Sequence, residues 1–236
     1  LSGSGSDTIS AGRGDDTVRA GDGNNDINVG SGDNQVYAGR GADDVTAGSG
    51  DDRIEVGDGR NTVEAGDGDN RVVTGRDSDR IEAGSGDDTI KAGTGDNKVE
   101  AGSGDNYVSA GSGRDTISGG SGDDTVYAGD GANRVVAGNG DNLVSSGSGS
   151  DTISSGRGDD TVRAGDGNND IDVGKGDDQV YTGRGHDTVD AGSGDNRVET
   201  GAGNDRVSAG SGDDTIKAGT GDNRVEAGSG DNYVSA

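Results

Sequence analysis

Aliphatic residues recur along the chain at a fixed interval of nine. When repeats are counted from Ser2, position 8 is valine or isoleucine in all 26 complete repeats, and position 1 is mostly alanine. In residues 83–91, AGSGDDTIK, a Gly-rich stretch that favours a turn precedes a short alternating stretch that favours a β-strand. Side chains alternate across a strand, so Ile90 and Ala92 share one face. We expect positions 8 and 1 to face a common core.

The true period is 18 residues. Position 5 is aspartate in every even-numbered repeat, from Asp15 to Asp231, and varies in the odd-numbered repeats. A fixed repeat of this kind is typical of solenoids, whose units bury their apolar faces only against neighbouring units. We therefore predict an all-β fold: a right-handed parallel β-roll (β-solenoid) with two nine-residue repeats per 18-residue coil and about 13 coils. We expect one continuous roll over residues 1–236, with no separate domain or linker.

Composition excludes an ordinary globular core. The chain has 52 Gly, no Pro, Cys, Met, Trp or Phe, and a formal net charge of −26. Without the repeat, such low hydrophobicity would indicate disorder. Strong acidity argues against nucleic-acid partners, and no apolar run is long enough for membrane insertion. The charge favours cations as partners.

The turn motif is regular. Glycine occupies position 2 in every repeat and position 4 in all but one, where Asp77 stands, and position 6 is always Asp or Asn. Over essentially the whole chain, these residues resemble the repeats-in-toxin (RTX) family, whose nonapeptide is G-G-x-G-x-D-x-U-x. One departure is that Ala usually replaces the first family Gly, with a full match only at Gly119. The resemblance implies a parallel β-roll that binds calcium between turns of successive coils. Main-chain carbonyls and the position-6 Asp would be the ligands, a donor set that suits Ca²⁺.

The resemblance identifies the position-6 residues as candidate metal ligands. The carboxylate candidates are Asp7, Asp16, Asp43, Asp52, Asp79, Asp88, Asp115, Asp124, Asp151, Asp160, Asp178, Asp187, Asp205 and Asp214. The weaker candidates are Asn25, Asn34, Asn61, Asn70, Asn97, Asn106, Asn133, Asn142, Asn169, Asn196, Asn223 and Asn232.

Asp and Asn alternate along each edge of the predicted roll, so that Asn97 has Asp79 and Asp115 as its neighbours in the adjacent coils. The alternation slips only at two places, Asp160 with Asp178 and Asp187 with Asp205. An all-Asp column would bring like charges together in every coil. An Asn amide can instead donate to a neighbouring carboxylate, so a column could be satisfied without metal. The pattern leaves a calcium site and a metal-independent ladder both open.

The two edges differ in charge. Positions 5 and 6 together carry 20 Asp on the edge formed by the even-numbered repeats and nine on the other. We expect the even edge to bind calcium more strongly.

Catalysis is not expected. The only histidine, His186, lies at a variable turn position, and carboxylate pairs such as Asp51 with Asp52 recur in many repeats, so none marks a unique acid–base site. No GxGxxG or GK[ST] phosphate loop occurs.

These observations predict a structural calcium-binding module of a secreted or cell-surface protein, hence an extracellular one. Calcium would fold or stiffen this acidic rod, because a ligand that binds only folded turns stabilises them. Unpaired strand edges on the outermost coils predict end-to-end self-association, and with it fibres. The alternative is a metal-independent β-solenoid scaffold, natural or designed, with alternating Asp and Asn ladders.

Overall fold

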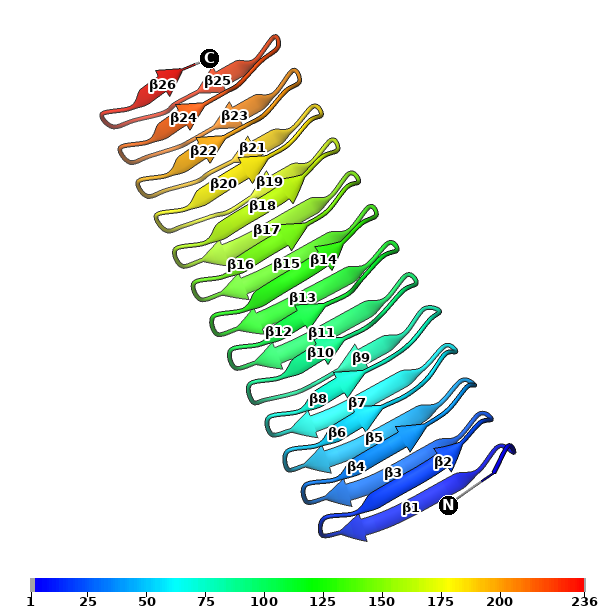
Figure 1. Ribbon diagram of the computed structural model, residues 1–236. Coiled ribbons are helices and arrows are strands. Elements are labelled where there is room, and N and C mark those ends of the chain that lie inside the picture. The colour runs from blue at the N-terminus through cyan, green and yellow to red at the C-terminus, as the bar shows by residue number, and fades with distance from the viewer. Residues whose placement is uncertain (1–2, 236) are drawn as a thin grey trace.

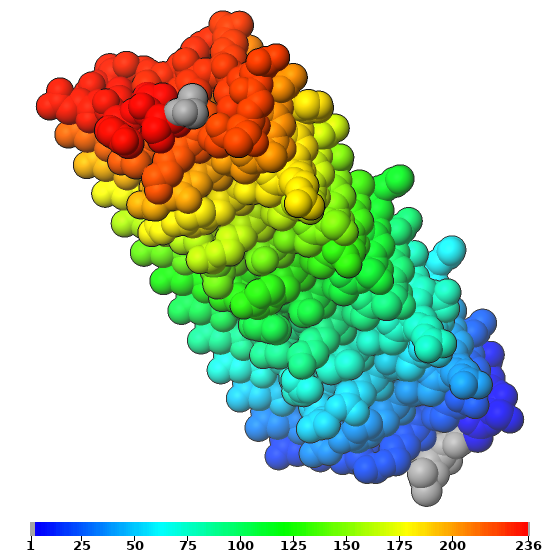
Figure 2. All heavy atoms as spheres, turned by 45° about the horizontal axis from the view of Figure 1, so that its top comes forward, coloured from blue at the N-terminus to red at the C-terminus, as the bar shows by residue number. Residues whose placement is uncertain are grey.

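A computed structural model describes residues 3–235, which form 26 β-strands and no helix. The strands make two parallel sheets of 13 strands each (Figure 1). Odd-numbered strands form one sheet and even-numbered strands the other, so the chain changes sheet at every turn. The stacked coils make a continuous rod, in which the colours follow one another as bands from end to end (Figure 2).

The strands are short. The first sheet contains β1 (Thr8–Arg13), β3 (Asp26–Ser31), β5 (Asp44–Ser49), β7 (Thr62–Asp67), β9 (Arg80–Glu82), β11 (Lys98–Ser103), β13 (Thr116–Ser121), β15 (Arg134–Asn139), β17 (Thr152–Arg157), β19 (Asp170–Asp172), β21 (Thr188–Asp190), β23 (Arg206–Ser208) and β25 (Arg224–Glu226). The second contains β2 (Thr17–Gly21), β4 (Gln35–Ala38), β6 (Arg53–Glu55), β8 (Arg71–Val73), β10 (Thr89–Lys91), β12 (Tyr107–Ser109), β14 (Thr125–Gly129), β16 (Leu143–Ser146), β18 (Thr161–Gly165), β20 (Gln179–Thr182), β22 (Arg197–Glu199), β24 (Thr215–Lys217) and β26 (Tyr233–Ser235).

Strand register confirms the 18-residue coil. Ile90 on β10 pairs with Val72 on β8 and with Val108 on β12, each 18 residues away. The same spacing relates Thr8 to Asp26 at the start of the first sheet. The predicted parallel solenoid of about 13 coils, with two repeats in each, is therefore confirmed.

The core is a thin double layer of small aliphatic side chains. Ile90 at position 8 and Ala92 at position 1 are both fully buried, as are their counterparts in most repeats. This confirms the predicted inward positions. Hydrogen bonds between successive coils continue through the turns, as from Thr89 N to Asn70 O (2.8 Å) and from Gly86 N to Ser103 O (2.9 Å).

Glycine is required in the turns both by backbone conformation and by close approach between coils. Gly86 has φ +124°, and a Cβ there would lie 2.3 Å from the carbonyl oxygen of Gly68 in the preceding coil. That carbonyl therefore points toward the next turn. Among the described residues, Asp77 is the one non-glycine residue with positive φ, at 81°. It keeps the positive φ of the glycines at this position, so it is a strained residue in an otherwise regular turn.

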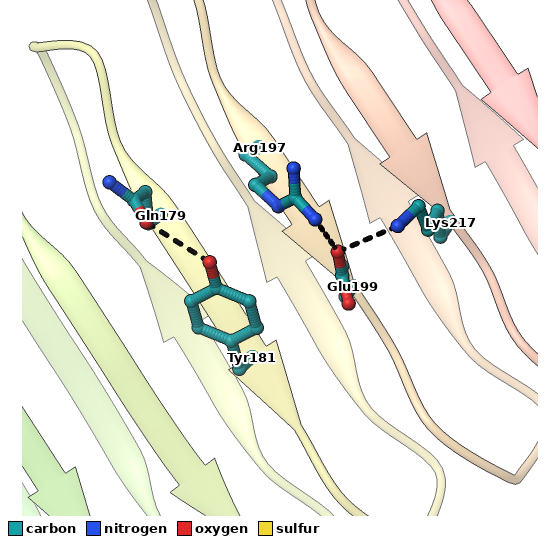
Figure 3. A network of polar contacts seen from close by, with 5 residues as sticks. All are labelled: Gln179, Tyr181, Arg197, Glu199 and Lys217. Carbon is teal, nitrogen blue, oxygen red and sulfur yellow. Dashed lines mark hydrogen bonds and ion pairs between the residues drawn. The ribbon is translucent and has the colours of Figure 1, made fainter.

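The outward positions 7 and 9 carry pairs of polar side chains. On the second sheet, Tyr181 donates to Gln179 (3.0 Å), and Glu199 accepts from Arg197 on its own strand and from Lys217 Nζ on β24 (3.0 Å) (Figure 3). These contacts place Tyr181 in the packing of the strand face. No helix long and apolar enough to cross a membrane occurs in residues 3–235.

Candidate functional site

The candidate ligands lie in the turns along the two long edges of the rod. We call the turns before the odd-numbered strands the odd edge and those before the even-numbered strands the even edge. Position-6 side chains point into the turn, and most are buried as deeply as the aliphatic core: Asp88 is 1% exposed and Asn106 is 2% exposed. The sequence pattern placed these residues in turns but did not predict their burial.

From the second coil onward, one oxygen of each position-6 side chain joins its coil to the preceding one. Asp88 Oδ1 accepts a hydrogen bond from the main-chain nitrogen of Asn70 (2.8 Å), and Asn106 Oδ1 accepts one from the main-chain nitrogen of Asp88 (3.0 Å). Aspartate and asparagine serve equally well here because both present an acceptor oxygen. This bond explains why position 6 is Asp or Asn throughout.

The second terminal atom distinguishes the two residue types. Asn70 Nδ2 donates to the carbonyl oxygens of Gly66 (3.2 Å) and Gly68 (2.8 Å) in its own turn, and of Ala83 (3.5 Å) in the next turn. All twelve position-6 asparagines donate Nδ2 to at least one main-chain carbonyl. We call such a group of carbonyls, from positions 2 and 4 of one turn and position 1 of the next, an oxygen cage.

In the aspartates, an oxygen takes the place of this amide. A Cβ built on Gly119 would lie 2.5 Å from both Asp124 Oδ2 and the carbonyl oxygen of Ala137 at position 1 of the next turn, so these two oxygens border the same small space. In 13 of the 14 position-6 aspartates, Oδ2 is buried and has no hydrogen-bond partner: Asp16, Asp43, Asp52, Asp79, Asp88, Asp115, Asp124, Asp151, Asp160, Asp178, Asp187, Asp205 and Asp214. A carboxylate oxygen facing carbonyl oxygens is unfavourable unless a proton or a cation lies between them.

Burial raises the pKa of these carboxyl groups. The pKa of Asp88 and of Asp115 rises to about 6, chiefly because burial disfavours the charged form. The pKa of Asp178 rises to about 7, again mainly through burial, with the charge of Asp160 in the adjacent coil contributing. Hydrogen bonds donated to these carboxylates from the adjacent coil lower the pKa values, but the effect of burial outweighs them.

The oxygen cages fit a hard cation. Main-chain carbonyls and a carboxylate oxygen are the ligands Ca²⁺ prefers, and its flexible coordination tolerates a donor set built mostly from backbone. Residues 3–235 contain no cluster of three or more His, Asp or Glu side chains that could hold a metal ion. The cages would therefore bind calcium mainly through the main chain, with one carboxylate from the leading turn.

The metal-independent contact that the sequence allowed also occurs. Asn25 Nδ2 donates to Asp43 Oδ1 in the next coil at 2.7 Å, and Asn142 donates to Asp160 at 3.0 Å. Asn169 and Asp187 form the third such pair, also at 3.0 Å. The asparagine amide therefore donates to main-chain carbonyls of its turn whether or not it also donates to a carboxylate in the next coil.

Position 5 lies outside the cages. The position-5 aspartates of the even edge are exposed. In all but the last turn, their Oδ1 accepts a hydrogen bond from a main-chain nitrogen of the next coil, as from Asp105 N to Asp87 Oδ1 (2.7 Å). His186 does the same on the odd edge, where its Nδ1 accepts from Asn204 N (2.9 Å). Sequence reasoning missed this second ladder. At the cages, position 5 acts only through its electric field, and stronger binding at the even edge stays a prediction.

Fold and turns together define a class: a parallel β-solenoid whose Gly-rich turns form oxygen cages faced by aspartate. The family model described as RTX calcium-binding nonapeptide repeat (4 copies) matches the chain in overlapping segments from residues 1–36 to 199–234, which together span residues 1–234. The chain belongs to this family. A search of curated proteins finds no match.

Proposed function

We propose that the chain is a structural calcium-binding module of a secreted or cell-surface protein, in which calcium ions in the turns fold or stiffen one continuous acidic rod. The observation that carries the proposal is the Oδ2 of 13 position-6 aspartates, Asp7 not among them, which is buried and has no hydrogen-bond partner. Extracellular location rests on the family, whose repeats occur in secreted proteins. No catalytic role is part of this proposal.

Energetics supports a role for calcium in folding. The core contains little beyond Val, Ile and Ala, and ordering the backbone of each residue costs about 1 to 2 kcal/mol. A cation that binds only the folded turns adds to stability by mass action and neutralises charge that would otherwise repel across coils. Calcium is therefore expected to favour the rolled state.

Calcium titration of the chelator-treated chain tests the proposal, with circular dichroism and calorimetry followed together. We expect calcium to increase β-structure or its melting temperature while heat is released or absorbed in a saturable way. A cooperatively melting β-structure that is identical in excess chelator and in calcium, with no binding heat, would contradict the proposal. Magnesium at the same concentration is the control, because its preference for octahedral, partly hydrated coordination fits these turns less well.

A metal-independent scaffold is the second candidate. Its support is the hydrogen bonding already present: each of the ten position-6 asparagines that has a following turn on its edge donates to a carbonyl of its own cage, and the Oδ1 ladder joins successive turns. This candidate predicts the chelator-resistant outcome of the same titration. End-to-end association belongs to both candidates, because β25 and β26 are edge strands of the two sheets and Val234 is 45% exposed.

A further inference from the structure

Successive turns on one edge enclose two kinds of gap, which we name by the residue at position 6 of the leading, lower-numbered turn. In an Asn-led gap, such as the one between the turns of Asn70 and Asp88, the asparagine amide points at the oxygen cage. In an Asp-led gap, such as the next one, Oδ2 of Asp88 is in the equivalent place and has no donor. The two kinds alternate along each edge apart from the two slips.

We propose that the position-6 asparagine amide replaces a cation in its own gap, so that calcium binds only in Asp-led gaps. This inference rests on the proposed function and sets the number and position of the ions. A cation placed in an Asn-led gap would face two N–H hydrogens, and the amide would first have to give up its bonds to the carbonyls.

The amide and the cation would satisfy the same oxygens in different ways. Asn70 donates to Gly68 O at 2.8 Å, a full hydrogen bond, while the Oδ1 of Asp88 borders the same gap and is held by the main-chain nitrogen of Asn70. The Asn-led gap is thus fully bonded by the chain alone. Only the Asp-led gap has a buried charge that calls for a counter-ion.

Counting gives a definite stoichiometry. Thirteen turns on each edge leave twelve gaps, or 24 in all, and 14 of them are Asp-led, seven on each edge. Fourteen calcium ions carry 28 positive charges, close to the net charge of −26, whereas 24 ions would carry 48. Alternation therefore matches the bound charge to the charge of the chain.

Three multiple variants of the full chain test this, each examined by equilibrium dialysis with metal analysis and by anomalous diffraction from calcium-containing crystals. The first changes the even-edge asparagines 34, 70, 106, 142 and 196 to Asp, and we expect the count to rise from 14 to 19. The second changes the even-edge aspartates 52, 88, 124, 160 and 178 to Asn, and we expect it to fall to nine. The control changes the exposed position-5 aspartates 51, 87, 123, 159 and 177 to Asn and is expected to keep 14.

The outcomes separate this inference from the proposed function. If the unaltered chain binds no calcium, the proposed function fails, and the inference with it. If the chain binds calcium but ions appear in Asn-led gaps, or the count approaches 24, the inference alone is overturned. If the first variant does not fold, the second still decides the matter, since it adds only hydrogen-bond donors. A second variant that keeps all 14 ions would overturn the inference.

Discussion

Asn70 Nδ2 and Asp88 Oδ2 occupy equivalent places in successive turns of the even edge, and only the amide nitrogen has hydrogen-bond partners. The two side chains otherwise behave alike, since each Oδ1 accepts a main-chain nitrogen from the preceding coil. A single change of atom, from nitrogen to oxygen, thus turns a closed hydrogen-bonded turn into one that requires a proton or a cation.

Asp88→Asn should stabilise the calcium-free rod. The new amide would donate to the cage carbonyls, whereas leaving a buried polar atom unsatisfied costs about 1 to 3 kcal/mol. We expect a gain of about that size in urea unfolding with excess chelator. Asp87→Asn, at an exposed position whose Oδ1 ladder an amide oxygen can maintain, is the matched control and should change little. A loss of stability in Asp88→Asn would contradict the cage geometry.

Metal-free stability should fall as pH rises. The folded pKa is about 6 for Asp88 and Asp115 and about 7 for Asp178, all above the ordinary value of 3.8. A raised folded pKa means that the folded state holds its protons more tightly than the unfolded state. The stabilisation is therefore complete below pH of about 4 and is lost as pH rises through 6 to 7. Melting in chelator at pH 5 and pH 7.5 checks the sign.

Calcium should reverse this trend, because it competes with protons for the same carboxylates. We expect calcium to bind more weakly at pH 5.5 than at pH 7.5, and to raise the melting temperature most above pH 7. For the metal-free prediction above, the contradicting outcome is a melting temperature in chelator that increases between pH 5 and pH 7.5, because buried carboxyl groups with raised pKa values would lower it. Sodium chloride at matched ionic strength controls for general screening.

The fold was predictable because every nine-residue repeat has the same order of Gly-rich turn residues and alternating strand residues. Ile90 and Ala92 lie on one face of a strand, and Asp15 to Asp231 mark the 18-residue period, so coil size and core followed from periodicity alone. The candidate site was only partly predictable. Burial of Asp88 depends on how the carbonyls of adjacent coils enclose it, which is a relation between turns 18 residues apart. Sequence spacing identifies the neighbours but not the direction in which each side chain points.

Close packing of turns predicts a position-specific cost for removing glycine. Gly86→Ala combines φ +124° with a Cβ that would lie 2.3 Å from Gly68 O, and we expect a loss of more than about 3 kcal/mol. Gly12→Ala has a similar φ of +116°, but no atom lies within 4 Å of its Cβ. It should lose only the conformational part, about 1 to 2 kcal/mol. Equal losses in the two variants would show that contact between coils contributes nothing.

Asp77→Gly should stabilise the rod with or without calcium. Asp77 has φ 81° at a position that is glycine in every other repeat, and an L-residue in this region costs about 1 to 2 kcal/mol, somewhat less for Asp. We expect a gain of about 1 kcal/mol in urea unfolding. Asp77→Ala separates charge from conformation, because it removes the carboxylate but keeps the strain. Stabilisation by Ala equal to that by Gly would indicate that charge, and not φ, is the cause.

The gap between the turns of Asp160 and Asp178, where two aspartates follow each other on the even edge, should be among the strongest calcium sites. Asp178 Oδ1 accepts the main-chain nitrogen of Asp160 at 2.8 Å, and Asp160 Oδ2 is unpartnered, so two carboxylates border one gap. Calcium affinity rises with the number of charged ligands. We expect Asp178→Asn to remove the ion from the gap that Asp178 leads and to weaken calcium affinity in the gap led by Asp160 about tenfold, or about 1.4 kcal/mol, so that the tightest step of the calorimetric titration is lost. Asp124→Asn, which removes one regular gap, should lower the ion count and leave the tight step in place. If the two variants weaken the same step, a second carboxylate adds nothing to a gap.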